Sequence, residues 1–269
     1  MSNPSSLLRG VSSEIVKATT LRAWWIGSGL VLLLTFYYAA SNANLFAELM
    51  ASEQNGYFTD FDGSLTSVPQ AVRESLLASP YQSSALLLPL LTTFIAGTEY
   101  GTNQIVQSRL ITPNPRQLLL QKFLASSLLC VLVVAVAFLL SFVTLKAMLP
   151  SVAAELLTGG LTLRVFAVVV AFALTMNLVA EAFTASFRRT IPALLMVLLL
   201  LLLALSGVLG LINPVLANVI PMIGAKTLLF GYEADSNAFS TAQGVALLAV
   251  WATASLALWF HAYRGRRDL

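Results

Sequence analysis

Residues that carry metal and nucleophilic chemistry are scarce in this chain, which has a single cysteine, Cys130, and a single histidine, His261. One cysteine cannot form an intrachain disulfide, and no cysteine-based metal site can be assembled from it. His261 stands beside Tyr263 and Arg264 at the end of an apolar stretch, where a snorkelling interfacial residue is the stronger interpretation. The sequence therefore predicts no metal site and no catalytic residue.

Signatures of enzymes and of nucleotide-binding proteins are missing as well. The sequence contains no Gly-x-x-x-x-Gly-Lys-Ser/Thr loop, no His-Glu-x-x-His and no Gly-x-Ser-x-Gly. Charged residues make up only 10% of the 269 residues, and the net charge is +3. Because the basic residues flank apolar stretches, this charge does not indicate nucleic-acid binding. We expect a protein that is not an enzyme and does not bind nucleic acid.

Long apolar stretches are what the sequence has in abundance, since 58% of its residues are hydrophobic. Six stretches are each about long enough to cross roughly 30 Å of hydrocarbon as a helix. They cover residues 22–41, 81–98, 123–147, 163–187, 191–212 and 244–263. The sequence thus predicts an all-α integral membrane protein with six transmembrane helices, in which residues 1–269 form a single transmembrane domain.

The 15 basic residues are distributed unevenly over the connections between these stretches. One side has Arg9, Lys17, Arg22, Arg109, Arg116, Lys122, Arg188, Arg189, Arg264, Arg266 and Arg267, and the other has only Arg73, Lys146, Arg164 and Lys226. The positive-inside rule assigns the richer side to the cytoplasm. We therefore predict a multi-pass protein of the plasma membrane with both termini in the cytoplasm.

Three segments outside the apolar stretches have features of their own. Residues 5–20 place apolar side chains at helical spacing, which predicts an amphipathic interfacial helix on the inner leaflet, or otherwise a simple extension of the first span. The external loop, 41–80, is polar and acidic, and we expect a short helix near its end. The apolar residues of 213–243 are interrupted by Pro221 and Gly224. They predict a re-entrant or interfacial external segment before the last span, with an ordinary outer-leaflet helix as the alternative.

A polar stripe crosses the fourth apolar stretch. Asn177, Glu181, Thr184 and Arg188 recur at i, i+4, i+7 and i+11, so they lie on one face of a helix. A charged side chain within a span costs about a few kcal/mol, so Glu181 needs an explanation. The stripe is a candidate translocation or gating face. The alternative, which we favour, is a buried polar network with another span.

The most informative connection is 99–122. Glu99 and Tyr100 end the second apolar stretch, and a short apolar patch that begins at Ile105 follows. Pro113 and Pro115 then force an extended break before the next helix. The pattern predicts a stiff turn-helix-turn element held close to the membrane.

These residues resemble the permease subunit of type-2 ABC transporters, many of which are bacterial exporters. The matching positions are Glu99, Tyr100, Ile105, Pro113, Arg116 and Lys122, whereas Asn103-Gln104 and Pro115 depart from the family's pattern. The resemblance extends to the plan of an amphipathic N-terminal helix, six spans and an apolar external segment before the last span. It implies that 99–122 is the cytoplasmic coupling loop, which seats on a separate ABC ATPase.

The resemblance also implies the partners and the function. Two copies of the ATPase would bind the ATP and Mg²⁺, so this chain has no cofactor of its own. A second permease copy, as a homodimer or as a paralogue, would complete the path through the membrane lipid. We expect export of a lipophilic or amphiphilic compound. The alternative is a secondary transporter that uses Glu181 as an ion or proton site; an ATPase encoded beside this chain would favour the first hypothesis.

Overall fold

The computed structural model describes residues 4–50, 56–59, 65–213, 219–230 and 240–264, and most of these residues are helical. Leucine and alanine, which favour helices, dominate the long segments between the turns. In chain order the elements are α1 (Pro4–Thr20), α2 (Arg22–Met50), β1 (Tyr57–Thr59), β2 (Leu65–Ser67), α3 (Val68–Gly101), α4 (Gln104–Ile111), α5 (Pro115–Met148), α6 (Ser151–Glu155), α7 (Gly159–Phe187), α8 (Thr190–Ser206), α9 (Val208–Ile212), α11 (Pro221–Phe230) and α12 (Thr241–Arg264).

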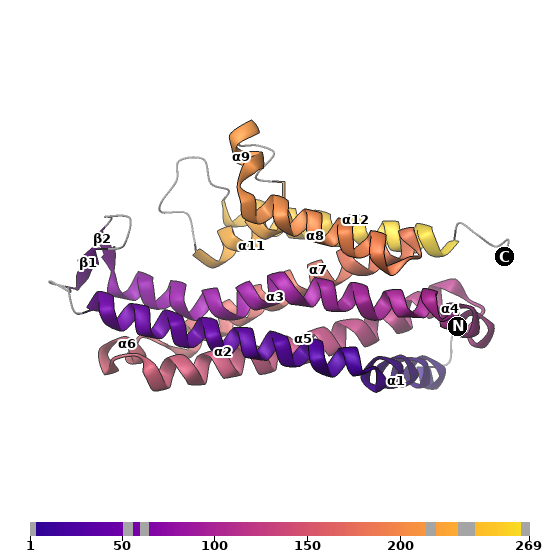
Figure 1. The fold of residues 1–269 in the computed structure, drawn as a ribbon, viewed down its shortest axis with the longest axis horizontal. Helices are drawn as coiled ribbons and strands as arrows, with labels where there is room; N and C mark the ends of the chain where they lie inside the picture. Colours follow the sequence, from indigo (N-terminus) through magenta and orange to yellow (C-terminus); the bar gives the residue numbers. More distant parts are fainter. Residues whose placement is uncertain (1–3, 51–55, 60–64, 214–218, 231–239, 265–269) are drawn as a thin grey trace.

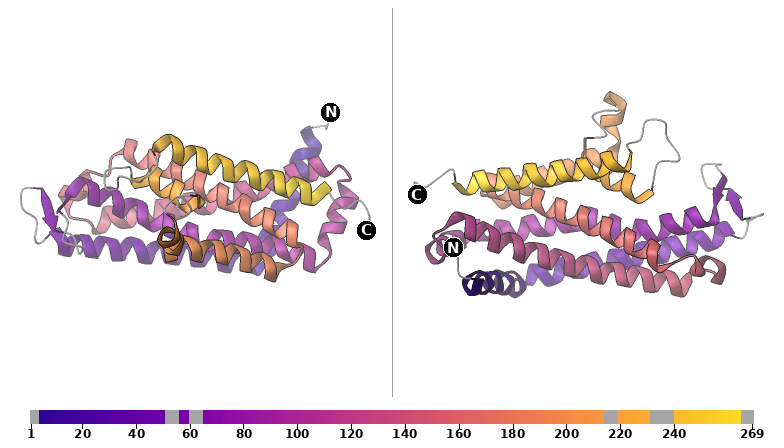
Figure 2. Two further views of the ribbon diagram at one scale, coloured as in Figure 1. Left: turned by 90° about the horizontal axis from the view of Figure 1, so that it is seen from above. Right: turned by 180° about the vertical axis from the view of Figure 1, so that it is seen from behind.

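The long helices run side by side along one axis, and α7 packs against α3, α5, α8, α11 and α12 (Figures 1 and 2). Helices α2, α3 and α5 form one side of this bundle. One end of the molecule contains α1, α4 and the last turns of α12, and we call it the α4 end. The other end contains α6 and the antiparallel β1–β2 pair, and we call it the hairpin end.

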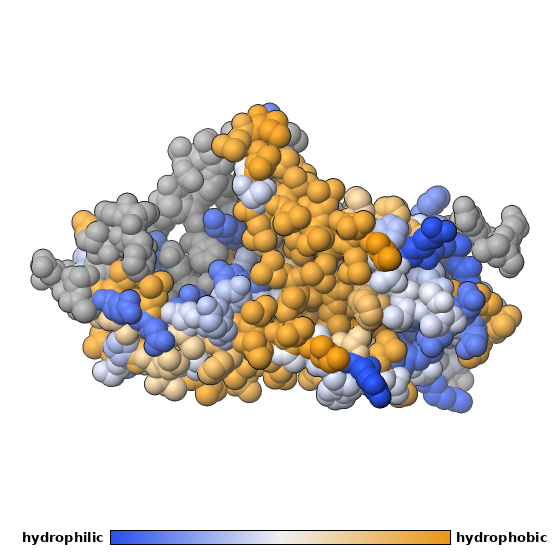
Figure 3. Space-filling model, in the orientation of Figure 1, coloured by the Kyte–Doolittle hydropathy of each residue, from blue (hydrophilic) through white to orange (hydrophobic). Residues whose placement is uncertain are grey.

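Four helices in the described part of the chain are long and apolar enough to cross a membrane. They are α2, α5, α7 and, over residues Thr241–Tyr263, α12. Their lengths of 23 to 34 residues correspond to roughly 35–50 Å, which exceeds the hydrocarbon thickness of a bilayer. The hydrophobic residues form a broad band over the middle of the face shown in Figure 3, with polar residues gathered at the α4 end. These features are compatible with a multi-pass membrane protein.

The two remaining predicted spans fall on helices that differ from the expectation. Residues 191–212 are divided at Gly207, whose left-handed conformation has a φ of 65°. Helix α8 therefore ends after 17 residues, about 25 Å, and α9 projects away from the bundle (Figure 1). The stretch 81–98 lies within α3, which has 34 residues but many serines and threonines. Length and apolar composition alone thus identify four spans, not six.

The predicted external loop, 41–80, lies at the hairpin end and contains more secondary structure than expected. Helix α2 continues to Met50, and Tyr57 pairs with Ser67 in the short hairpin. Helix α3 begins at the next residue. The short helix predicted near the end of this loop is the first part of α3, which continues through Pro80 and Pro89 without ending.

The segment predicted to be re-entrant or interfacial contains α11, and its residues 214–218 and 231–239 lie outside the described part of the chain. Helix α11 packs on α7 and α12, and the Tyr81 hydroxyl of α3 donates a hydrogen bond to the Met222 carbonyl at 2.8 Å. A Cβ atom on Gly224 would lie 3.1 Å from the Gly244 carbonyl oxygen. The two backbones therefore approach closely because both positions lack a side chain.

Buried side chains form three clusters along the bundle axis. The central cluster joins α2, α3, α5, α7, α8, α11 and α12. A cluster of apolar residues that includes Phe46 and Leu145 lies at the hairpin end. The third cluster, which includes Ile105, Leu118 and Trp259, lies at the α4 end. Beside this third cluster, the bundle also buries charged groups.

Candidate functional site

A buried ammonium group lies at the start of α5 in the α4 end. The Lys122 side chain is only 7% exposed, and its Nζ donates to both carboxylate oxygens of Glu99, at 2.6 and 2.5 Å. It also donates to Glu14 Oε2 at 2.8 Å. A lysine is rarely buried unless it is paired, and here two carboxylates from other helices pair with it. This ion-pair network therefore joins α1, α3 and α5.

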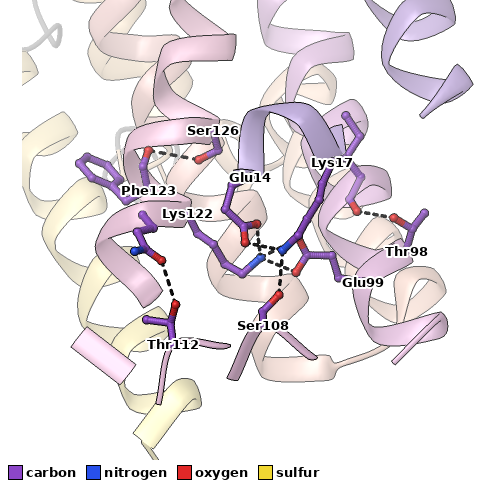
Figure 4. Close-up of polar contacts among 11 residues, drawn as sticks. Glu14, Lys17, Thr98, Glu99, Ser108, Thr112, Lys122, Phe123 and Ser126 are labelled. Atoms are coloured by element: carbon purple, nitrogen blue, oxygen red, sulfur yellow. Dashed lines mark hydrogen bonds and ion pairs between the residues drawn. The ribbon is translucent and has the colours of Figure 1, made fainter. Parts of the chain in front are cut away.

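The network continues to α4 through a second lysine (Figure 4). Lys17 Nζ donates to Glu14 Oε1 at 2.6 Å and to the Ser108 hydroxyl at 2.9 Å. Ser108 lies on α4 and is buried. Helix α1 crosses the end of the bundle instead of continuing the axis of α2, which brings Glu14 and Lys17 over the other three helices (Figures 1 and 2). A displacement of α4 would therefore act on α1, α3 and α5 together.

Glu14 is the acidic group through which both lysines connect. Burial favours the neutral acid, but the positive charges and hydrogen bonds of Lys122 and Lys17 outweigh it. The net effect lowers the pKa of the Glu14 carboxyl below its usual value. Glu14 is thus an ionised partner at neutral pH, and α1 is held by charge as well as by packing.

A partly open cavity of about 70 Å³ lies next to this network. It is bounded by α1, α2, α3, α5, α7 and α12 and has room for a few water molecules. Its polar lining includes Glu99, Lys122, Asn177, Glu181 and Tyr263. In its described residues, the chain has no group of three or more histidine, cysteine, aspartate or glutamate side chains that could hold a metal ion.

The polar stripe predicted on the fourth span divides among several environments on α7. Asn177 is 3% exposed and bridges two helices: it accepts from Thr92 at 2.9 Å and donates to Ser126 at 3.1 Å. Glu181 lines the cavity. The fully buried Thr184 hydroxyl donates to the carbonyl of Ala180 in its own helix. Asn177 and Glu181 therefore share the cavity wall, and Thr184 is not among the residues that line it.

The six residues predicted for coupling separate into a buried and an exposed group. Glu99 and Lys122 form the ion pair, Tyr100 lines the cavity and Ile105 packs in the apolar cluster beside α5, α7 and α12. The other two, Pro113 and Arg116, are exposed at the α4 end. The Asn114 side chain accepts a hydrogen bond from the amide N–H of Arg116 and so caps α5.

The outer face of α4 is apolar and unusually exposed. Leu110 is 76% exposed, Ile111 is 81% exposed and Val106 is 52% exposed, although this short helix lies at the end of the bundle. The apolar residue Ile105 and the polar residue Ser108 fix the inner face of the same helix. We call Val106, Leu110 and Ile111 the α4 outer patch.

Sequence reasoning missed Glu14, Lys17 and Ser108 as members of the site. The amphipathic pattern of α1 showed its charged residues on the polar face, and a polar face of an interfacial helix normally meets water and headgroups. No local signal indicates that Glu14 pairs with Lys122, which lies 108 positions further along the chain. The spacing of Glu14 and Lys17 at i and i+3 was the only available indication that they interact.

Comparisons with known proteins leave the family open. No protein-family model matches this chain, and no curated protein matches it in sequence.

Proposed function

We propose that this chain is the membrane-spanning permease subunit of an ABC transporter, with six spans and both termini in the cytoplasm. In this proposal α3 and α8 complete the set of spans. Helix α3 suits a span because its polar residues Ser83, Ser84 and Thr93 are all fully buried against neighbouring helices. Helix α8 is short, but a thinned bilayer or a flanking segment accommodates such a mismatch at modest cost.

The observation that carries the proposal is the construction of α4. An exposed apolar patch at the α4 end needs a partner, because protein surfaces in water rarely keep such residues together. The opposite face of α4 is bonded through Ser108 and Lys17 to the buried ion pairs of three other helices. A partner that presses on the α4 outer patch would thereby move helix ends inside the bundle, which is what a coupling element of an ATP-driven transporter must do.

The further parts of the proposal follow from the resemblance of the 99–122 segment. Two permease copies would enclose the path, as a homodimer or with a paralogue, and two cytoplasmic ATPases would bind ATP and Mg²⁺. The transported compound would be lipophilic or amphiphilic and would be exported across the plasma membrane. The exposed leucines of α8, including Leu195, Leu199 and Leu202, suit contact with lipid or with the second copy.

Coexpression with an ABC ATPase encoded beside this chain tests the proposal. We expect the two proteins to purify together and the complex in nanodiscs to hydrolyse ATP. Leu110→Asp places a charge in the α4 outer patch and should abolish co-purification. Val152→Asp is the matched control, because Val152 is 66% exposed on α6 at the hairpin end. Equal co-purification of both variants, or none by the unmodified chain, would reject the docking assignment.

The topology and stoichiometry are tested separately. In a Cys130→Ala background, Asn114→Cys should resist impermeant thiol reagents added outside intact cells, and labelling there would overturn the orientation. Native mass spectrometry of the active complex should give two permease chains and two ATPases. An active species with one permease chain and no second permease would contradict the paired arrangement.

One observation favours a second candidate, the secondary transporter. Glu181 faces the cavity and makes no hydrogen bond or ion pair with any other described residue. An intramembrane carboxylate of this kind is typical of ion-coupled transport. Uptake or export in proteoliposomes that follows a proton gradient, requires Glu181 and proceeds without ATP would support this alternative.

A further inference from the structure

The charges around the cavity are not balanced. Glu14 and Glu99 are matched by Lys17 and Lys122, which leaves Glu181 as the one carboxylate without a counter-charge of its own. An ionised carboxylate that is removed from bulk water is costly unless a positive group meets it. The site therefore has a place for one more positive charge, either a proton on the Glu181 carboxyl or a cation beside it.

Lys122 has no hydrogen-bond donor left for Glu181 while the network is intact. An ammonium group has three N–H donors, and the three short contacts to Glu14 Oε2 and to both oxygens of Glu99 use all of them. The other charged or titratable groups that line the cavity are Glu14, Glu99, Tyr100, Tyr263 and Cys130. None of these is a cation, so no other described residue that lines the cavity supplies the positive charge.

The rest of the lining indicates what kind of cation fits. Trp24 and Tyr100 present aromatic rings, and Leu91, Ile95 and Leu129 add apolar walls. Aromatic faces attract organic cations, which shed water readily, whereas a small inorganic ion would need a shell of oxygen ligands. The volume of about 70 Å³ admits a ligand of few heavy atoms, since drug-sized ligands occupy pockets of about 300–1,000 Å³.

We propose that this cavity is a binding site for a small organic cation, a protonated amine or a quaternary ammonium ion, whose positive nitrogen faces Glu181. Asn177 and the network of Lys122 hold the surrounding walls in place, and Trp24 and Tyr100 contact the apolar groups of the ligand. The site belongs to this chain alone, so it does not depend on the docking of an ATPase. If the chain is an exporter, this site would bind the cationic group of the transported amphiphile.

Titration of the purified full chain in nanodiscs tests the proposal, with methylammonium and tetramethylammonium chloride as probes. Isothermal titration calorimetry at constant pH and ionic strength should show saturable binding of at least one probe, and the thermal unfolding midpoint should rise with it. Sodium and potassium chloride should show neither effect. Glu181→Gln should weaken binding by about tenfold or more, and Glu181→Asp should restore part of it.

The controls separate the site from general charge effects. Glu155→Gln removes an exposed carboxylate on α6 and should bind the probes like the unmodified chain. If Glu181→Gln proves unstable, Trp24→Phe keeps a ring in place while Trp24→Leu removes it, and only the second should weaken binding. Equal binding of sodium, unchanged binding by Glu181→Gln, or stabilisation by acid alone would each overturn the organic-cation site.

Discussion

The two ends of the bundle are held together by different interactions. At the hairpin end, the buried cluster consists of apolar residues such as Ala43, Phe46 and Leu145. At the α4 end, Glu14, Lys17, Glu99 and Lys122 form three ion pairs that join α1, α3 and α5. Both ends bring distant segments of the chain together. They differ in the interaction that joins these segments, which is apolar packing at the hairpin end and ion pairing at the α4 end.

Because of this contrast, the two ends should differ in how they respond to pH, to salt and to a docked partner. Apolar packing has no preferred partner atom, and its strength changes little with pH or salt. A buried ion pair is a weaker source of net stability because desolvation offsets attraction, yet it requires particular partners in a particular geometry. The α4 end is therefore the end at which a docked partner or a change in protonation can alter the arrangement of helices.

The largest effect should come from removing the central cation. Lys122→Met keeps the length of the side chain but leaves Glu99 as an uncompensated buried carboxylate and Glu14 with Lys17 as its remaining partner. Breaking a buried pair on one side costs about 3–5 kcal/mol, and repulsion between the two acids adds to that cost. We expect a marked fall in the thermal unfolding midpoint in detergent and faster labelling of a cysteine placed at Ser13 of α1.

Lys146→Met is the matched control for this change. Lys146 lies on the same helix, α5, but it is exposed near the hairpin end and its Nζ rests over the Phe142 ring at 5.8 Å. Its substitution should change the midpoint only slightly, because exposed charges contribute little. If the unfolding midpoint fell by a similar amount in both variants, the ion-pair network would contribute no more to stability than an exposed lysine does.

The hairpin end should respond less strongly to its own central deletion. Leu145 is fully buried in the apolar cluster, and Leu145→Ala leaves a cavity. In soluble proteins such changes cost about 2–5 kcal/mol. We expect the lower end of that range, since helices in lipid have little hydrophobic driving force between them and only lost packing counts. The measured midpoint shift should be the same at low and high salt.

Val143→Ala gives the comparison within α5, because Val143 is 55% exposed and its truncation leaves no interior cavity. A salt-dependent effect of Leu145→Ala, or an equal effect of Val143→Ala, would contradict the apolar character assigned to the hairpin end.

How far the sequence anticipates the structure also differs between the two ends. Long apolar stretches predict α2, α5, α7 and α12 because a span leaves a continuous local signal. The division of 191–212 was missed since a single Gly207 within a run of leucines gives no warning that it will adopt a left-handed conformation. The pairing of α1 with Lys122 was missed for a different reason. It depends on the angle at which α1 crosses the bundle, which no local pattern specifies.

Acidification should weaken the α4 end in a defined pH range. Since the folded protein lowers the pKa of Glu14, the stability that this carboxylate contributes is complete above its unfolded pKa of about 4.3. That contribution is lost as the pH falls through the lower, folded value. We expect Glu14→Gln to cost about 1.5 kcal/mol at neutral pH, the low end for hydrogen bonds to charged groups, because Lys122 keeps Glu99.

The measurement is the difference in unfolding midpoint between the unmodified chain and Glu14→Gln from pH 7 to pH 3. This difference should stay constant down to about pH 5 and then close. Glu48→Gln, which removes an exposed carboxylate near the hairpin end, is the matched control, because exposed charges contribute little to stability. A gap that closes already between pH 7 and pH 6 would mean that Glu14 is not held ionised by the two lysines.

The smallest effect should come from filling the contact between α1 and α5 next to the ion pairs. A Cβ atom at Gly10 would lie 2.1 Å from the amide group of Gln121, the neighbour of Lys122. That amide is the flexible end of its side chain and makes only long hydrogen bonds, 3.5 Å to the Ser6 carbonyl and 3.4 Å from Thr112. It can therefore rotate away, and alanine favours the helix by about 1 kcal/mol. Gly10→Ala should change the unfolding midpoint by less than Glu14→Gln does, and a loss as large as that of Lys122→Met would show that the packing of α1, and not its charges, fixes this end.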